Sequence, residues 1–247
     1  GLSFSQPLQT ISSIATSTAI LLEAVRLMKS DIRVFNTGSS ECYGHCDVPA
    51  PEDAPFDPRS AYGVARVSSF WIAKNYREAY GIHVATGILA NHESPLRPTR
   101  FVTRKIIQAV ARIRDSSSER LKLGNIKVQR DWGWAPEFVE AFWMLLQADK
   151  PSDYNIATGQ TNSLLDFVQE AFVAVGLDWR DHADVDDGLL RPSDFLATRI
   201  DPSMIATVLG GRARFTMADV VRMLLAREAD GGLGPVPWAS DQLPTTD

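Results

Sequence analysis

Apolar residues recur every three or four positions along several long stretches of the chain. Because an α-helix turns once in about 3.6 residues, this spacing places them on one face and predicts helices. Short apolar runs of strand length lie between these stretches. The pattern predicts helices over residues 8–29, 60–80, 101–114, 135–148, 164–175, 202–209 and 217–228, and strands over residues 33–36, 83–89 and 154–157.

Strand and helix alternate over the first two thirds of the chain, which indicates a parallel α/β sheet. The last third changes character, and we expect a smaller mixed lobe there, packed on the sheet. Residues 37–44 read as a loop after a strand. Two more loops are expected, residues 49–58 with several prolines and acids, and the Asp-rich residues 178–187.

The composition is that of an ordinary globular protein, with 247 residues, 45% hydrophobic and 22% charged. A formal net charge of −5 argues against a general nucleic-acid surface. No apolar run approaches the length of about 18 residues that a membrane span needs, and no secretion leader is visible. We therefore expect a cytoplasmic protein that binds neither nucleic acid nor a membrane.

The two cysteines, Cys42 and Cys46, flank His45 closely enough to suggest metal ligands. Three candidates without a distant fourth ligand make a weak zinc signal. Structural or incidental roles are favoured for both cysteines, and no metal site is predicted.

Tyr62 and Arg66 are the most informative pair of polar residues. Their i, i+4 spacing in SAYGVAR (residues 60–66) places both on one face of the predicted helix. A fixed positive charge beside a phenol favours phenolate, which can act as a base. The usual cation in such sites is Lys, whereas Arg is a wider fork that is always charged. Taken alone, Tyr62 is more often a packing residue.

Ser39 and Glu41 follow the predicted strand at residues 33–36. An extended i, i+2 pair points to one side of the chain. Hydroxyl, carboxylate, phenol and guanidinium could then converge at the carboxyl edge of the sheet, where open α/β folds bind ligands. The alternative is that Ser39 and Glu41 cap or close a loop.

Seven segments, in matching order, resemble one enzyme family. TGSSECYG (37–44) and SAYGVAR (60–66) are similar to the extended short-chain dehydrogenase/reductases that act on sugar nucleotides. The later segments narrow this resemblance to GDP-mannose 4,6-dehydratases over residues 2–228. These segments are GILANHESP (87–95), FVTRK (101–105), LGN (123–125), RDWG (130–133) and RP (191–192). NHESP followed by FVTRK is far more specific than a tyrosine and a cation alone.

The resemblance implies a reaction on GDP-mannose. Hydride leaves C4 for NADP, water is eliminated across C5 and C6, and the hydride returns to C6. By position, Tyr62 takes the proton of the C4 hydroxyl and, with Arg66, also contacts the cofactor. Ser39 stands where the family has Thr and hydrogen-bonds the same region. Glu41 handles the C5 proton and the departing C6 hydroxyl.

The resemblance also implies a set of substrate-binding residues. Arg130 and Arg191 suit the diphosphate, because guanidinium forks bind such oxygens in pairs. From the residues alone, Arg130 and Asp131 could instead form a surface turn, and Lys105 could lie on a solvated helix face. His92 could contact the substrate or support a residue that does. The remaining implied residues are Asn91, Val102, Lys105 and Asn125 around the nucleotide, and Asp194 in place of a Glu near the ribose.

No G-x-x-G-x-x-G or G-x-G-x-x-G motif occurs, although dinucleotide-binding α/β folds normally place one after their first strand. The implied fold class is α/β, a Rossmann-like parallel sheet that lacks its first strands and Gly-rich loop, with a smaller C-terminal α+β substrate lobe. We expect residues 1–95, interleaved with 120–165, to form the Rossmann-like domain. Residues 96–120 and 166–230 form the substrate lobe, and 231–247 a flexible tail.

Two further departures from the family accompany the absent Gly-rich loop. Arg66 replaces Lys, and residues 96–100 read LRPTR where the family has RRGET. NADP is therefore expected from the resemblance, but without its ordinary site. The predicted function is a dehydratase-like enzyme; the alternative is a catalytically silent GDP-sugar-binding subunit. A third possibility is that a segment preceding Gly1 was removed or is encoded separately.

The resemblance also implies a homodimer or homotetramer. Related enzymes commonly build a four-helix dimer interface from the helices that correspond to residues 8–29 and 60–80. An absence of the first strands would in addition expose the flank of the sheet and invite pairing with another chain.

Overall fold

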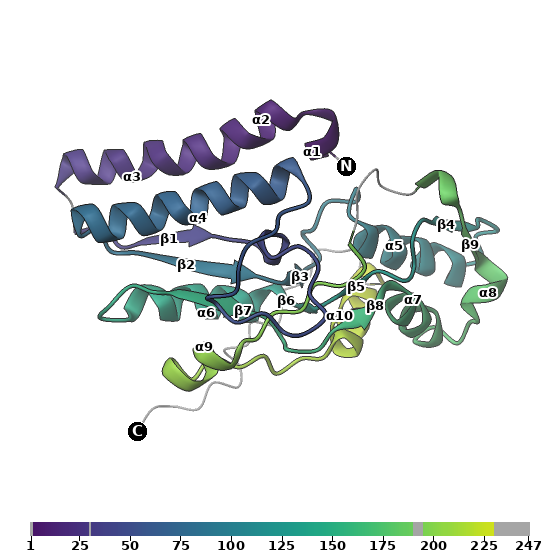
Figure 1. The fold of residues 1–247 in the computed structure, drawn as a ribbon. Helices are drawn as coiled ribbons and strands as arrows, with labels where there is room; N and C mark the ends of the chain where they lie inside the picture. Colours follow the sequence, from purple (N-terminus) through teal and green to yellow (C-terminus); the bar gives the residue numbers. More distant parts are fainter. Residues whose placement is uncertain (1, 30, 190–194, 230–247) are drawn as a thin grey trace, which may run out of the picture.

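A parallel sheet forms the centre of the computed structural model, which describes residues 2–29, 31–189 and 195–229 (Figure 1). Its strands are β1 (Val34–Thr37), β2 (Val84–Leu89) and β7 (Asp153–Ile156), in the order β1-β2-β7. Both pairings are parallel. The predicted α/β class with a parallel sheet is confirmed, and each predicted strand lies within one residue of its expected bounds.

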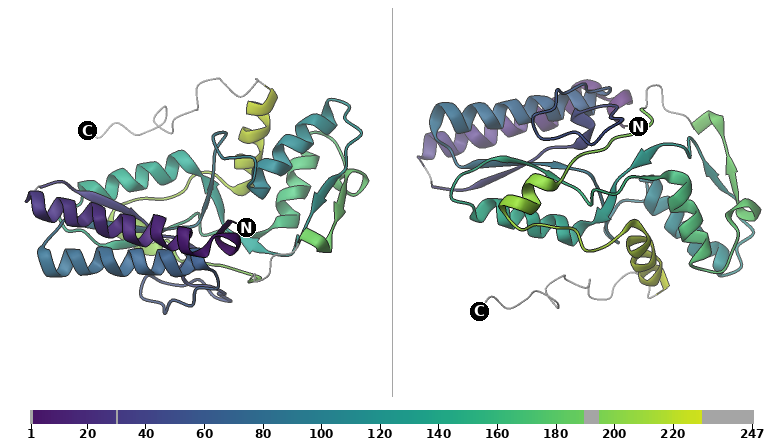
Figure 2. Two further views of the ribbon diagram at one scale, coloured as in Figure 1. Left: turned by 90° about the horizontal axis from the view of Figure 1, so that it is seen from above. Right: turned by 60° about the horizontal axis from the view of Figure 1, so that its bottom comes forward.

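Two long helices lie side by side on one face of this sheet, and one helix covers the other (Figures 1 and 2). The first face carries α3 (Ser17–Met28) and α4 (Ala61–Tyr80), and the second carries α6 (Ala135–Gln147). Ser60 begins α4 by accepting a hydrogen bond from the N–H of Gly63, and Gly81 ends it in the left-handed region at φ 68°. Phe142 of α6 stacks on Phe35 of β1, with ring centroids 4.2 Å apart.

The predicted helix over residues 8–29 is one continuous helical segment made of several parts. A short α1 (Leu2–Ser5) precedes α2 (Pro7–Ile11), and a π-helical turn, η1 (Ser12–Thr16), joins α2 to α3. The segment Pro7–Met28, with a mean hydropathy of 1.4, is long and apolar enough to cross a membrane. The expectation that no such stretch exists was therefore wrong; core helices of soluble proteins and signal sequences pass the same test. Here Thr18 and Glu23 hydrogen-bond to α4 through Ser69 and Tyr76.

Three helices, α5 (Val102–Arg114), α7 (Leu164–Val173) and α10 (Met217–Ala229), pack together beside the sheet (Figure 1). They enclose an apolar cluster that includes Ile106, Phe167 and Leu224. Short strand pairs border it: β3 (Asn91–Glu93) with β6 (Trp132–Trp134), β4 (Leu121–Leu123) with β9 (Ala183–Val185), and β5 (Gln129–Arg130) with β8 (Asn162–Ser163). The proposed division into two domains remains a prediction.

The Asp-rich residues 178–187 are not the continuous loop that we expected. They contain α8 (Trp179–His182) and β9, followed by the 3₁₀ turn η3 (Asp187–Leu189). Asp178 caps α8 by accepting the N–H of Arg180 at 3.0 Å, and Ala183 is buried in the pairing with β4. The aspartates that suggested a loop thus include a helix cap.

The other predicted helices are confirmed within two residues of their expected ends, including α9 (Ser203–Val208), which contacts β7. A 3₁₀ turn, η2 (Ser40–Cys42), interrupts the predicted loop after β1. The loop over residues 49–58 contains no helix and only an isolated bridge from Ala50 to Ile200. The predicted tail, residues 231–247, lies outside the described residues.

Candidate functional site

The carboxyl end of β1 and the first turn of α4 meet closely. A Cβ atom on Gly63 would lie 3.1 Å from the carbonyl oxygen of Glu41, so only Gly fits this approach without displacement. Glu41 Oε2 accepts a hydrogen bond from Ser60 Oγ at 3.2 Å, and Ser39 Oγ accepts the N–H of Glu41 at 3.2 Å. Ser39 and Glu41 therefore do close a turn, and they also lie beside the residues that begin α4.

Tyr62 and Arg66 contact each other as the spacing predicted. Arg66 Nε donates to Tyr62 Oη at 3.1 Å. Arg66 Nη1 donates to the carbonyl oxygen and to the hydroxyl of Thr37, at 2.5 and 2.8 Å. The guanidinium thus joins the phenol to the last residue of β1. No local pattern marks Thr37, because its contact with Arg66 joins residues 29 positions apart.

These contacts place the four predicted catalytic side chains around one strand end. Ser39 is buried, and Glu41, Tyr62 and Arg66 are each half-buried. A hydroxyl, a carboxylate and a phenol beside a guanidinium can together exchange protons with one ligand.

β3 contributes a second group of polar residues next to this strand end. Asn91 begins β3 and pairs in register with Trp132 of β6. His92 Nδ1 lies 2.9 Å from the carbonyl oxygen of Ala90, and its ring stacks on Phe138 at 5.0 Å. Burial lowers the pKa of His92 below its ordinary value, so the ring is neutral at neutral pH.

Glu93 is a fully buried carboxylate that sequence reasoning missed. Its Oε2 accepts a hydrogen bond from Thr103 Oγ1 at 2.6 Å and lies 3.2 Å from Arg97 Nε. Burial raises the pKa of Glu93. Through these contacts Glu93 holds the loop after β3 against the first turn of α5. The ion-pair partner, Arg97, lies in the segment LRPTR (96–100), which departs from the RRGET of the family but keeps Arg at this position.

The alternative that Arg130 and Asp131 form a surface turn is wrong. Asp131 is 4% exposed, and its carboxylate accepts hydrogen bonds from the N–H and hydroxyl of Thr158 and from the N–H of Gly159. Burial raises the pKa of Asp131 to about 6. Arg130 does not pair with Asp131; its guanidinium donates to the carbonyl oxygen of Phe195 at 3.3 Å and lies 4.4 Å from that ring.

The predicted nucleotide-binding residues lie on several elements, and those that the structure describes contact different neighbours. Lys105 Nζ donates to the carbonyl oxygen of Lys122 at 2.6 Å, which links α5 to β4. Asn125 accepts the N–H of Lys127 at 3.0 Å in a local turn. Val102 packs at the start of α5. Arg191 and Asp194 lie outside the described residues.

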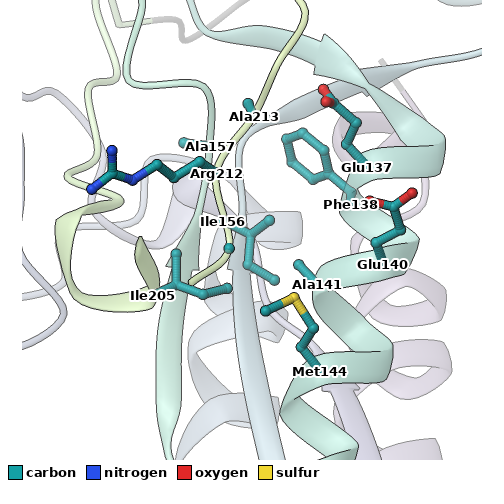
Figure 3. Close-up of a pocket in the computed structure, with 11 residues that line it drawn as sticks. Glu137, Phe138, Glu140, Ala141, Met144, Ile156, Ala157, Ile205, Arg212 and Ala213 are labelled. Atoms are coloured by element: carbon teal, nitrogen blue, oxygen red, sulfur yellow. The ribbon is translucent and has the colours of Figure 1, made fainter. Parts of the chain in front are cut away.

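A hollow on α6 holds none of the predicted residues (Figure 3). It lies between α6 and the chain around residues 205–213. Glu137 and Glu140 border it, but both carboxylates bind Arg214, at 3.0 and 2.8 Å. Through these ion pairs, Glu137 and Glu140 hold the segment that leads into α10 against α6. The residues bordering the hollow therefore serve the packing of the fold.

Within residues 2–29, 31–189 and 195–229, no group of three His, Cys, Asp or Glu side chains could hold a metal ion. Cys42 and Cys46 are both free thiols. Burial raises the pKa of the Cys42 thiol to about 12, so it is protonated at neutral pH.

Known proteins resemble this chain in both sequence and fold. The family model for GDP-mannose 4,6 dehydratase matches residues 1–224. GDP-mannose 4,6 dehydratase 1 of Arabidopsis thaliana is 40% identical over 232 residues, which cover 92% of this chain and 64% of the plant protein. The GDP-mannose 4,6-dehydratase of Sinorhizobium fredii is 42% identical over 205 residues, covering 81% and 58%. The chain thus spans less than two thirds of the length of these relatives.

Solved structures support the fold. RMD from Pseudomonas aeruginosa, complexed with NADPH, superposes with a TM-score of 0.83 at 20% identity, covering 91% of this chain and 75% of that one. DesIV, a dTDP-glucose 4,6-dehydratase from Streptomyces venezuelae with NAD and TYD bound, gives 0.82 at 20%, covering 93% and 70%. The sequence match extends over nearly the whole chain, and the fold agrees with it. This chain belongs to the GDP-mannose 4,6-dehydratase family.

Proposed function

We propose that this chain provides the proton-transfer residues and the GDP-sugar site of a GDP-mannose 4,6-dehydratase. One observation carries the proposal: in a chain of this family, Ser39, Glu41 and the Tyr62–Arg66 pair surround the carboxyl end of one parallel strand. Ligands of open α/β sheets bind at that edge. The alternative of a silent binding subunit has no observation of its own in its favour.

In this proposal Tyr62, as phenolate, takes the proton of the sugar C4 hydroxyl. Arg66 already donates to the phenol oxygen at 3.1 Å, and this contact stabilises the negative charge. Ser39 holds the same hydroxyl by a hydrogen bond. Glu41 removes the C5 proton and delivers a proton to the departing C6 hydroxyl.

The donor set at this strand end fits the reactive end of NADP, because a phenol with a fixed cation suits proton transfer coupled to hydride transfer. NADP, when bound, supplies the hydride acceptor for C4 and the donor for C6. Tyr62 and Arg66 are the residues that would hold it here. The sequence contains neither G-x-x-G-x-x-G nor G-x-G-x-x-G, the motifs that ordinarily hold its pyrophosphate.

The substrate in this proposal is GDP-mannose or a related GDP-sugar. Arg130 and Arg191 bind the diphosphate, and the nucleotide lies among Asn91, Val102, Lys105, Asn125 and Asp194. Arg130 supports this role because its guanidinium is held in place by carbonyl oxygens and by the ring of Phe195.

A homodimer built on α3 and α4 belongs to the same proposal, with a homotetramer as the larger form. Ile20, Leu27 and Trp71 are large apolar side chains that stand 65%, 65% and 53% exposed on these helices. Burying them against a second copy removes apolar surface from water. A cytoplasmic setting fits the two free thiols.

The experiment is incubation of the purified protein with GDP-mannose and NADP, with a 4-keto-6-deoxy sugar nucleotide as the expected product. Calorimetry with GDP-mannose measures binding separately from turnover. Tyr62→Phe is expected to bind GDP-mannose with unchanged affinity and to lose turnover. Binding without turnover in the wild type favours the silent subunit, and absence of both contradicts the proposal.

A further inference from the structure

α4 meets the sheet through small side chains on its inner face. Ala65, Ser69 and Ala73 recur every four residues along the helix, and each is 0% exposed. They let α4 lie close over β1 and β2 (Figure 1), but they provide no large ridge that would lock its position along the strands. Of these three side chains, only that of Ser69 can form a directional bond to the sheet.

Ser69 binds the buried amide of Asn36 on β1. Its Oγ donates to Asn36 Oδ1 at 2.8 Å, and Asn36 Nδ2 donates to Thr86 Oγ1 of β2 at 3.2 Å. Asn36 and Thr86 are 7% and 0% exposed. Because a buried polar group that loses its partner costs free energy, these bonds hold α4 at one place over β1 and β2.

A hydroxyl of α3 contacts Ser69 without competing for Asn36. Thr18 Oγ1 lies 2.9 Å from Ser69 Oγ and 2.8 Å from the carbonyl oxygen of Ile14. A hydroxyl has one proton, and that of Ser69 goes to Asn36, so Thr18 is the donor in its contact with Ser69. The bond between Ser69 and Asn36 therefore does not depend on Thr18.

The same side of α4 carries Tyr62 and Arg66 to the end of β1. Residues 62, 66 and 69 are spaced i, i+4 and i+7, so they follow one another along one side of the helix. Arg66 binds Thr37, and Ser69 binds Asn36, the residue before it. Successive turns of α4 are thus joined to consecutive residues of β1. A shift of α4 at Ser69 moves Tyr62 and Arg66 relative to the strand end.

Arg66 depends on this spacing more than a lysine would. Its Nε donates to Tyr62 Oη on its own helix at 3.1 Å, while its Nη1 donates to the hydroxyl and the carbonyl oxygen of Thr37 on β1. The guanidinium is a rigid planar fork, so both contacts require a narrow range of separations between helix and strand. An ammonium on a flexible stem can follow small movements of α4.

We propose that Ser69, through its hydrogen bond to Asn36, is a positioning residue for the Tyr62–Arg66 pair, an inference that rests on the proposed function. The bond keeps α4 at the distance from β1 at which one guanidinium reaches both the phenol and the strand end. Ser69 is fully buried, so it acts on proton transfer only through the placement of Tyr62 and Arg66.

The first test measures, by NMR of the purified protein, how fast the Arg66 Nε–H proton exchanges with water. This measurement needs neither substrate nor cofactor, and Arg66→Lys identifies the signal. Ser69→Ala and Asn36→Ala are each expected to speed the exchange by about fivefold or more, because the contact of Nε with Tyr62 Oη lengthens or breaks. Circular dichroism confirms that each variant is folded.

Three controls separate this bond from a general loosening of the fold. The Nε–H of Arg112 on α5 is expected to keep its exchange rate in the same spectra. Ser68→Ala removes a hydroxyl that bonds within α4, and Thr18→Val removes one on α3. Both keep the bond to Asn36, so both are expected to leave exchange of the Arg66 proton within about twofold of wild type.

Turnover of GDP-mannose with NADP gives a second reading. Ser69→Ala is expected to lower kcat by about tenfold or more, since a misplacement of about 1 Å can cost about a hundredfold in rate. Affinity for GDP-mannose in calorimetry stays within about twofold, because Asn91 and Lys105 of the predicted nucleotide site lie on β3 and α5. In Arg66→Lys, adding Ser69→Ala changes kcat by less than about twofold, because the ammonium does not need the fixed spacing.

Three results overturn the inference. They are unchanged Arg66 exchange in folded Ser69→Ala and Asn36→Ala, equal acceleration in Ser68→Ala or Thr18→Val, and unchanged kcat in an active Ser69→Ala. If one of the two main variants does not fold, the other decides. If neither folds, Ser69→Cys decides, because a thiol keeps the shape but donates weakly. A wild type that neither binds nor converts GDP-mannose contradicts the proposed function, and the exchange measurement still decides how the pair is positioned.

Discussion

The two outer edges of the three-stranded sheet, those of β1 and β7, differ in how the rest of the chain covers them. The outer edge of β7 is covered by the chain itself. Asn155 is fully buried there, and its Nδ2 donates to the carbonyl oxygens of Ala50 and Asp201 at 2.9 and 3.1 Å. Its Oδ1 accepts the hydroxyl of Tyr43 at 3.1 Å. A single amide thus joins three separate segments over that edge.

The outer edge of β1 is not covered in this way among the described residues. Its only strand partner there is β2, and the guanidinium of Arg66 binds Thr37 at its carboxyl end. Natural proteins cover, twist or charge an edge that stays in water, since an open edge pairs with other chains. Contacts within this chain thus cover the β7 edge, whereas over the described residues the β1 edge stays unpaired.

The largest expected effect is at the outer edge of β7, which the chain itself covers. Asn155→Leu removes the side-chain hydrogen bonds of Ala50, Asp201 and Tyr43 and leaves buried polar groups unpaired. We expect a loss of about 3 to 4 kcal/mol in the free energy of unfolding. Urea denaturation followed by circular dichroism measures it. A loss under about 1 kcal/mol would mean that the segments over β7 are held by packing, and that the two edges differ less than the contacts imply.

A second prediction concerns Asp131, which anchors Thr158 and Gly159 directly after β7. Burial raises its pKa from 3.8 to about 6, so the folded protein binds this proton more tightly than the unfolded chain does. Its contribution to stability is therefore fully present below about pH 4 and is lost as the pH rises through about 6. The loss amounts to about 3 kcal/mol.

The measurement compares unfolding free energies of wild type and Asp131→Asn from pH 4 to pH 7. Asn keeps an acceptor oxygen but does not titrate, so the difference between the two proteins isolates the carboxyl group. We expect wild type to lose stability relative to the variant as the pH rises. Parallel pH profiles would contradict a buried, titrating Asp131.

The sequence predicted much of this fold because its long elements carry a strong period. The helices α4, α5 and α6 present apolar stripes over several turns, and β2, mostly apolar, is buried at every position. Short elements escaped prediction, since β3, β4 and β6 are three residues long and have no period to read. They exist because a neighbouring strand pairs with them, which is a tertiary effect.

The candidate site was predicted in part for the same reason. Tyr62 and Arg66 lie four residues apart on one helix, so local geometry sufficed, and their contact is confirmed. Thr37, Glu93 and Asn155 have partners that are 10 to 112 residues away in sequence. No local pattern distinguishes such a residue from a solvated one. The predicted roles in binding and catalysis stay predictions.

A third, intermediate effect is expected at Arg130, which lies between the segments that cover β7 and the predicted nucleotide-binding residues. Its guanidinium contacts Phe195, just before the segment whose Ile200 bridges Ala50 over the β7 side. Arg130→Ala is expected to weaken GDP binding by about 1 to 3 kcal/mol if the guanidinium holds phosphate. Calorimetry with GDP measures this, with Arg180→Ala as the exposed control. Unchanged affinity would mean that Arg130 serves only to hold the segment around Phe195 in place.

The smallest expected effect is at Thr37, the last residue of β1. Thr37→Val removes the hydroxyl that accepts from Arg66 at 2.8 Å but keeps the carbonyl that accepts at 2.5 Å. Because Thr37 is exposed, we expect a change of less than about 1 kcal/mol in the free energy of unfolding of the chain alone. Urea denaturation followed by circular dichroism measures the change. A loss of more than about 2 kcal/mol would mean that the hydroxyl, and not the carbonyl, is the main contact of Arg66 with the end of β1.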